Sequence, residues 1–183
     1  MTQNQIGKSI NTGKLQLSTY HKFSHYGILL ISLLLVLVSL YAISEKLILN
    51  QPIRLERALI LFSGGILSAI FFIWLQTKRF RFKKIVISFP TDETFAIANK
   101  SIRKLGWKIS SKDYNYIVAK VYNGWLSGSW GEQVTVIVNY DSVYINSICD
   151  PDKKSSIASW GNNRKNVQKL INEMKTIAKE HYS

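Results

Sequence analysis

Cysteine, histidine and acidic residues are scarce in this sequence. Cys149 is the only cysteine among 183 residues, so no disulfide can form within the chain, which fits a reducing compartment. Of the three histidines, only His181 falls in the C-terminal half, far along the chain from Cys149. Neither a cluster of metal-ligand residues nor a Ser-His-Asp set can be assembled there. We therefore expect a protein that is not an enzyme and that holds no metal and no cofactor.

Charge is absent from two stretches of nineteen residues each, 26–44 and 58–76. A helix rises ~1.5 Å per residue, so each stretch spans roughly 28 Å, close to the ~30 Å hydrocarbon core of a bilayer. Neither stretch has the polar face of a helix in a soluble core. The connection between them is short and contains Pro52, which breaks a continuous helix. We therefore predict a transmembrane helical hairpin over residues 26–76.

Basic residues outnumber acidic residues, 24 to 11, and much of the excess flanks the two uncharged stretches. Positive residues stay on the cytoplasmic side of a membrane, where they also meet anionic lipid. We expect a multi-pass protein of a bacterial inner membrane with both termini in the cytoplasm and the lipid bilayer as a partner. The segment after the second stretch carries five basic residues and no acid: Lys78, Arg79, Arg81, Lys83 and Lys84.

Small residues four positions apart occur in the second stretch. Gly64 pairs with Ser68 in this way, and Gly65 with Ala69. Such pairs let another helix approach closely. The first stretch of the same chain is the expected partner, and self-association into a homo-oligomer is the alternative.

The rest of the chain divides into three parts. Residues 1–25 form a polar arm without a sustained apolar period, for which we expect mobility and at most a short interfacial helix. There His21 and His25 are interpreted as polar residues at the level of the lipid headgroups. Residues 77–81 form a basic linker, and residues 82–183 are long enough for one soluble domain.

Apolar periodicity predicts the elements of that domain. A helix begins with Thr91 or Asp92 as its cap and stops at Gly106, and a last helix is capped by Asn162 or Asn163. The order β-α-β-β-β-β-α predicts a small α+β domain with an antiparallel sheet and both helices on one face. The expected strands are residues 84–89, 107–110, 116–122, 133–140 and 143–149.

Two loops carry the residue types of a binding site. The glycine-rich loop 123–132 contains Trp125 and Trp130, which either stack on a ligand or the membrane interface, or cover the end of the core. The loop before the last helix brings serines, asparagines and one arginine to a helix N-terminus, which either binds an anion or is simply capped. The candidates in this second loop are Ser159, Asn162, Asn163 and Arg164.

Residues 143–171 resemble the C-terminal signature of an uncharacterised bacterial domain family. In that signature a strand ending in Ser precedes a loop and a Ser-x-Gly-x-Asn-Arg turn that opens the last helix. Trp160 departs from it, standing where an aliphatic residue is expected. The resemblance implies a fold but no activity, and the order of elements is similar to one repeat of the TATA-binding-protein-like fold. The matching positions are Ser147, Ser159, Gly161, Asn163 and Arg164.

These features favour a membrane-anchored, non-enzymatic accessory or binding module with a membrane or cytoplasmic protein partner. One alternative is an enzyme whose site lies in the two loops. Another is a tethered nucleic-acid-binding domain, since residues 81–183 hold sixteen Lys or Arg against nine Asp or Glu. The spread of the lysines along the domain disfavours nucleic acid as a partner: Lys100, Lys108, Lys120, Lys153 and Lys169.

Overall fold

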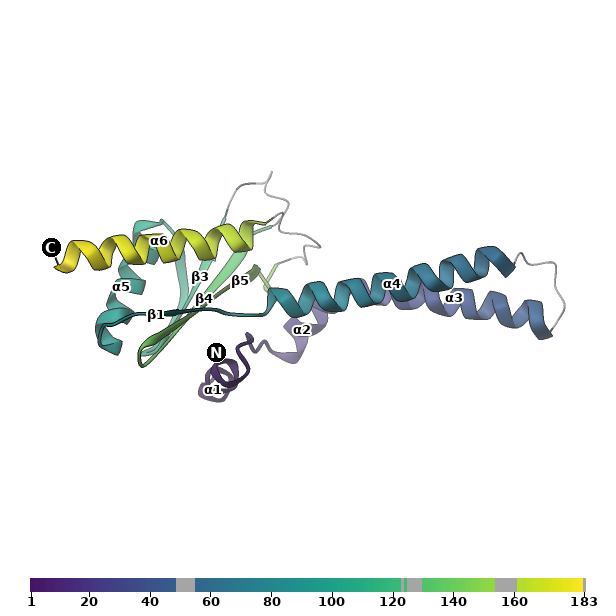
Figure 1. The fold of residues 1–183 in the computed structure, drawn as a ribbon, viewed down its shortest axis with the longest axis horizontal. Coiled ribbons are helices and arrows are strands. Elements are labelled where there is room, and N and C mark those ends of the chain that lie inside the picture. The colour runs from purple at the N-terminus through teal and green to yellow at the C-terminus, as the bar shows by residue number, and fades with distance from the viewer. Residues whose placement is uncertain (49–54, 123, 125–129, 154–160, 183) are drawn as a thin grey trace. The chain divides into compact units, whose positions relative to one another are not determined.

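The computed structural model divides the chain into two compact units, residues 22–78 and residues 1–21 together with 79–183 (Figure 1). The structure describes residues 1–48, 55–122, 124, 130–153 and 161–182.

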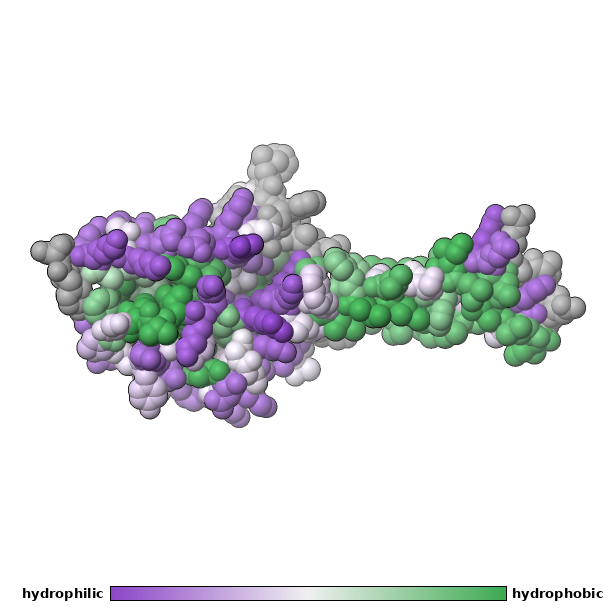
Figure 2. Space-filling model, in the orientation of Figure 1, coloured by the Kyte–Doolittle hydropathy of each residue, from purple (hydrophilic) through white to green (hydrophobic). Residues whose placement is uncertain are grey.

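The unit 22–78 consists mainly of two long apolar helices. Helix α3 covers Ile28–Ile48 and helix α4 covers Leu55–Arg79, so each helix continues past the C-terminal end of its uncharged stretch. Among the described residues, these two helices are long and apolar enough to cross a membrane, judged from length and composition alone. Their surface is largely apolar (Figure 2), and side chains such as Leu34 and Leu67 are 60% and 67% exposed.

Small side chains bring α3 and α4 together. A Cβ atom on Gly65 would lie 2.8 Å from Val36 Cγ2, closer than side chains tolerate, whereas one on Gly64 would meet nothing within 4 Å. Ser68 Oγ donates a hydrogen bond to Ser32 Oγ at 3.0 Å. The small residues thus serve packing within the pair on the side of Gly65 and Ser68.

The other unit contains a five-stranded sheet whose neighbouring strands are all antiparallel, in the order β1-β5-β4-β3-β2. The prediction of two long apolar helices followed by a small antiparallel sheet with helices is confirmed. The strands are β1 Lys83–Val86, β2 Lys108–Lys112, β3 Tyr116–Val121, β4 Glu132–Asn139 and β5 Ser142–Cys149.

Helices α5 (Thr91–Lys104) and α6 (Asn162–Tyr182) cover one face of this sheet. Alternate residues of the strands point toward them and form the main core, because successive strand side chains face opposite sides. We call this the helix-covered face. Its fully buried side chains include Ile102, Ile117, Val134, Val136, Ile145 and Leu170.

The start of α5 differs from the prediction. Pro90 is the N-cap residue, and no side chain hydrogen-bonds to the cap, so neither Thr91 nor Asp92 caps the helix. Proline fixes the φ angle needed at this entry, and Thr91 is already helical. At the other end Gly106 adopts φ 71°, a left-handed conformation that suits glycine and stops the helix as predicted.

The opposite face of the sheet carries helix α1, Gln3–Thr12, where mobility was expected. Ile6 is 2% exposed and packs with Tyr116, Val118 and Ile137 of the sheet. Reciprocal hydrogen bonds between Thr2 and Gln5 form a capping box at its start. The helix has ten residues, too few for a periodic pattern to stand out in sequence. We call this the arm-covered face.

Backbone hydrogen bonds join the arm to the chain that follows α4. Leu15 N donates to Phe80 O at 2.8 Å, and Phe82 N donates to Gly13 O at 2.9 Å. The buried Asn146 side chain donates from Nδ2 to the carbonyl oxygens of Arg79 and Arg81, both at 2.9 Å. The arm and the segment 79–82 are therefore fastened side by side on the domain.

Candidate functional site

The residues predicted in the two loops are placed only in part. Ser159 and Trp125 lie outside the described residues. Asn163 Oδ1 accepts a hydrogen bond from Ser147 Oγ at 3.2 Å, so this side chain ties α6 to β5. Arg164 is exposed on the first turn of α6, which begins at Asn162. Trp130 is 62% exposed.

The basic residues near the end of α4 make varied contacts. Lys78 Nζ lies 3.9 Å from the centre of the Trp74 ring, and Lys84 Nζ lies 5.7 Å from the centre of the Tyr144 ring. Arg81 forms an isolated antiparallel bridge with Lys14 of the arm. Lys83 begins β1 at the edge of the sheet.

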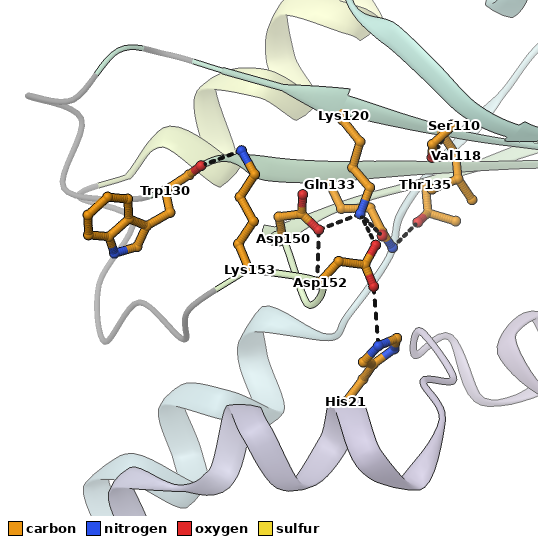
Figure 3. A network of polar contacts seen from close by, with 10 residues as sticks. All are labelled: His21, Ser110, Val118, Lys120, Trp130, Gln133, Thr135, Asp150, Asp152 and Lys153. Carbon is orange, nitrogen blue, oxygen red and sulfur yellow. Dashed lines mark hydrogen bonds and ion pairs between the residues drawn. The ribbon is translucent and has the colours of Figure 1, made fainter.

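A different set of polar residues converges on the arm-covered face, centred on Lys120 of β3 (Figure 3). Lys120 Nζ donates to Asp150 Oδ1, to Asp152 Oδ2 at 2.7 Å and to Gln133 Oε1 at 3.0 Å. Ion-assisted hydrogen bonds of this kind are the strong ones in proteins. We call the group of His21, Lys120, Asp150 and Asp152 the charged network.

The turn after β5 positions the two carboxylates. Asp150 N donates to Gly131 O at 2.9 Å, which continues the pairing of β4 and β5 past the strand end. Gly131 has φ 138°, a conformation that favours glycine, and a Cβ there would make a tight contact of 3.3 Å with Val121 O. Lys153 Nζ donates to Trp130 O at 2.8 Å and holds the turn from the other side.

His21 brings the arm into the network. Its Nε2 lies 3.3 Å from Asp152 Oδ1, so the Asp152 carboxylate bridges His21 and Lys120 with its two oxygens. The hydrogen bond from Lys120 holds the pKa of Asp152 below its usual value, and the nearby His21 acts in the same direction. Asp152 is thus ionised wherever the protein works near neutral pH.

A cavity of about 380 Å³ lies beside this network, between the arm and the sheet. Its volume falls in the range of small-molecule sites, about 300–1,000 Å³. Its wall is mixed and includes the apolar side chains of Met1, Leu17, Val118 and Pro151 beside amide and hydroxyl groups. The polar lining outside the network comprises Gln5, Gln16, Ser18, Ser110, Ser111 and Gln133.

Sequence reasoning missed this site, although one signal was present. Lys120 is the one charged residue of β3, and the other five residues of this strand are all buried, so its charge must face a partner on the second side of the sheet. Asp150 and Asp152 follow the end of β5 and supply that partner. His21 lies 131 positions before Asp152, and nothing in the sequence relates the two.

Comparison with known proteins finds no relative that could identify the site. The chain matches no protein-family model and no curated protein sequence. In the part of the chain that the structure describes, no three His, Cys, Asp or Glu side chains are grouped so as to hold a metal ion. What the charged network offers chemically is the ammonium of Lys120 and the imidazole of His21 beside a cavity, an arrangement that suits the binding of a ligand.

Proposed function

We propose that this protein is a membrane-anchored, non-enzymatic binding module on the cytoplasmic face of a bacterial inner membrane. Helices α3 and α4 would span the bilayer as a hairpin. The α+β domain would then present its loops and its cavity to a protein partner, an anionic headgroup or a small ligand.

The docking of the arm on the sheet is the observation that carries this proposal. Residues 1–21 precede α3 and residues 79–183 contain the domain that follows α4, yet the two segments form one compact unit. Ile6 packs on the sheet, and Leu15 and Phe82 are hydrogen-bonded across the two segments. A segment across the bilayer from the domain could not make these contacts. Two crossings return the chain to the side where it began.

The distribution of charge indicates that the side shared by the arm and the domain is the cytoplasm. Arg81, Lys83 and Lys84 follow α4 directly, and Lys14 and Lys22 precede α3, with no acidic residue in either segment. The same residues favour anionic lipid close to the domain. Arg164, exposed at the start of the 21-residue helix α6, is a further candidate for headgroup contact.

A cysteine cross-link tests the shared side. Directly paired antiparallel residues have Cα atoms about 4.5–5.5 Å apart, which a disulfide can bridge. The double variant Lys14→Cys/Arg81→Cys should therefore cross-link in intact membranes on addition of an oxidant, since these residues form a bridge. Lys14→Cys with Lys175→Cys is the matched control and should not cross-link. Absence of the first cross-link would place the arm and the domain on opposite sides.

Labelling with a membrane-impermeant maleimide tests which side it is. A cysteine in place of Asn50 should react in intact cells, and one in place of Lys175 only after permeabilisation. Cys149 is 3% exposed and gives a low background. The reverse pattern would overturn the cytoplasmic assignment while leaving the hairpin intact.

A further inference from the structure

The two carboxylates on Lys120 differ in how firmly they are held. The Asp150 side chain is 6% exposed, and its Oδ1 also accepts a hydrogen bond from Asp152 N at 3.1 Å. The Asp152 side chain is 61% exposed, and its carboxylate is held by Lys120 and His21. Asp150 is therefore the fixed counter-ion of Lys120, because unpairing a buried carboxylate is costly. Asp152 can turn into water without uncovering a buried charge.

From this difference we propose that the cavity binds a small polar molecule carrying a carboxylate, and that this carboxylate takes the place of the Asp152 side chain between Lys120 and His21. The inference rests on the proposed binding role but not on the placement in a membrane.

The positions of the Asp152 oxygens define the group that fits. Oδ2 lies 2.7 Å from Lys120 Nζ, and Oδ1 lies 3.3 Å from His21 Nε2. The two nitrogens come from opposite walls of the cavity, β3 and the arm, and both residues line it. A planar group with two acceptor oxygens satisfies both donors at once, as Asp152 does here.

The remaining wall of the cavity indicates the rest of the ligand. Gln5, Gln16 and Ser18 come from the arm, and Ser110 and Ser111 come from β2. These amides and hydroxyls suit hydroxyl, amino or amide groups of a ligand, and Leu17, Val118 and Pro151 offer apolar contact beside them. The expected ligand is therefore an amino or hydroxy acid with a short apolar part, compact enough for a cavity of about 380 Å³.

The count of hydrogen-bond partners supports a ligand with acceptor oxygens once Asp152 has turned away. The network then holds one carboxylate, that of Asp150, against the ammonium of Lys120 and the imidazole of His21. A ligand without a second acceptor oxygen would leave His21 Nε2 without the oxygen partner that it has now. An incoming carboxylate restores both contacts.

Removing the internal carboxylate should strengthen binding. Acetate serves as the probe, because it supplies the carboxylate alone, and the full-length protein is used in nanodiscs of zwitterionic lipid. In Asp152→Asn, acetate no longer competes with a tethered carboxylate, and we expect its dissociation constant to fall at least about tenfold. Binding is followed by line broadening of the acetate methyl NMR signal during titration, a readout that every variant allows.

Two variants give the matched controls. Asp92→Asn removes the same charge from an exposed position on α5 and should leave acetate affinity at the wild-type value. Asp152→Asn/His21→Gln lacks one of the two donors and should lose most of the gain. It keeps the buried Lys120–Asp150 pair, so the fold is retained.

Three results would overturn the proposal. One is equal affinity of wild type and Asp152→Asn for acetate. Another is an equal gain in Asp92→Asn, which would reflect net charge alone. The third is tighter binding of methyl phosphate than of acetate to Asp152→Asn, which would make this a phosphate site. The cross-linking and labelling above are independent of these outcomes, so failure here leaves the membrane assignment standing.

Discussion

The two faces of the sheet differ in what packs against them. On the helix-covered face, Val136, Leu170 and Met174 belong to one continuous apolar core closed by α5 and α6. On the arm-covered face, the apolar cluster around Ile6 and Ile137 is small, and the polar charged network lies beside it. The comparison indicates that one face supplies stability, whereas the other is free to carry polar chemistry and a displaceable segment.

Leu170→Ala should give the largest loss, because Leu170 is fully buried in the main core. Truncation of a buried leucine costs about 2–5 kcal/mol. Hydrogen exchange of the β4 and β5 amides in the full-length protein measures this loss, and all should exchange faster together. Exposed Lys169→Ala is the neighbouring control and should change little. A loss well under about 1 kcal/mol would show that the core is not closed by α6.

Ile6→Ala should give a smaller and more local loss. Burial of an isoleucine side chain contributes about 1.5–3 kcal/mol, and here the arm can detach while the main core stays closed. Exchange should therefore accelerate in α1 but not in the β4 amides that pair with β5. Lys8→Ala, on an exposed position of α1, is the control. Uniform acceleration throughout the sheet would contradict the division between the two faces.

Periodicity predicted the helix-covered face well. The predicted strand 143–149 corresponds to β5, Ser142–Cys149, and the stripe through Leu170 and Met174 is the buried side of α6. Long segments with one buried side leave a repeated signal in sequence. The two apolar helices were predicted from a different signal, nineteen consecutive uncharged residues without a polar face. The resemblance of residues 143–171 to an uncharacterised family remains a prediction.

The arm-covered face could not be predicted in the same way. Helix α1 presents only a few apolar residues, such as Ile6, and the contact of His21 with Asp152 joins positions 131 apart. The residue types typical of binding sites, Trp, Ser and Asn, are instead concentrated in the loops, which the sequence therefore favours as sites. In the sequence Lys120 is one of several dispersed lysines. Its partners are recognisable only once β3, β4 and β5 are paired.

The ion pairs of the two faces should lose their contributions to stability at opposite ends of the pH scale. On the helix-covered side, Lys104 Nζ lies 2.9 Å from Glu173 Oε1, and this contact raises the pKa of Lys104. Its contribution is fully present below the pKa of the unfolded chain and is lost as pH rises through the folded value. The stability difference between wild type and Lys104→Met should therefore disappear in strongly alkaline solution. A difference that is independent of pH would indicate lost packing instead.

Asp152 on the arm-covered face should show the reverse dependence, and the smallest effect. The hydrogen bond from Lys120 lowers its folded pKa, so its contribution is present above the unfolded value and lost as pH falls through the folded value. The side chain is 61% exposed, and exposed ion pairs contribute little. Hydrogen exchange of α1 should be slightly faster in Asp152→Asn than in wild type at neutral pH, because His21 loses its partner. The two should converge in acid, whereas exchange in α6 should not differ at any pH. If the difference instead grew on acidification, the Asp152 carboxylate would not be what holds His21, and the arm would be retained by its apolar contacts alone.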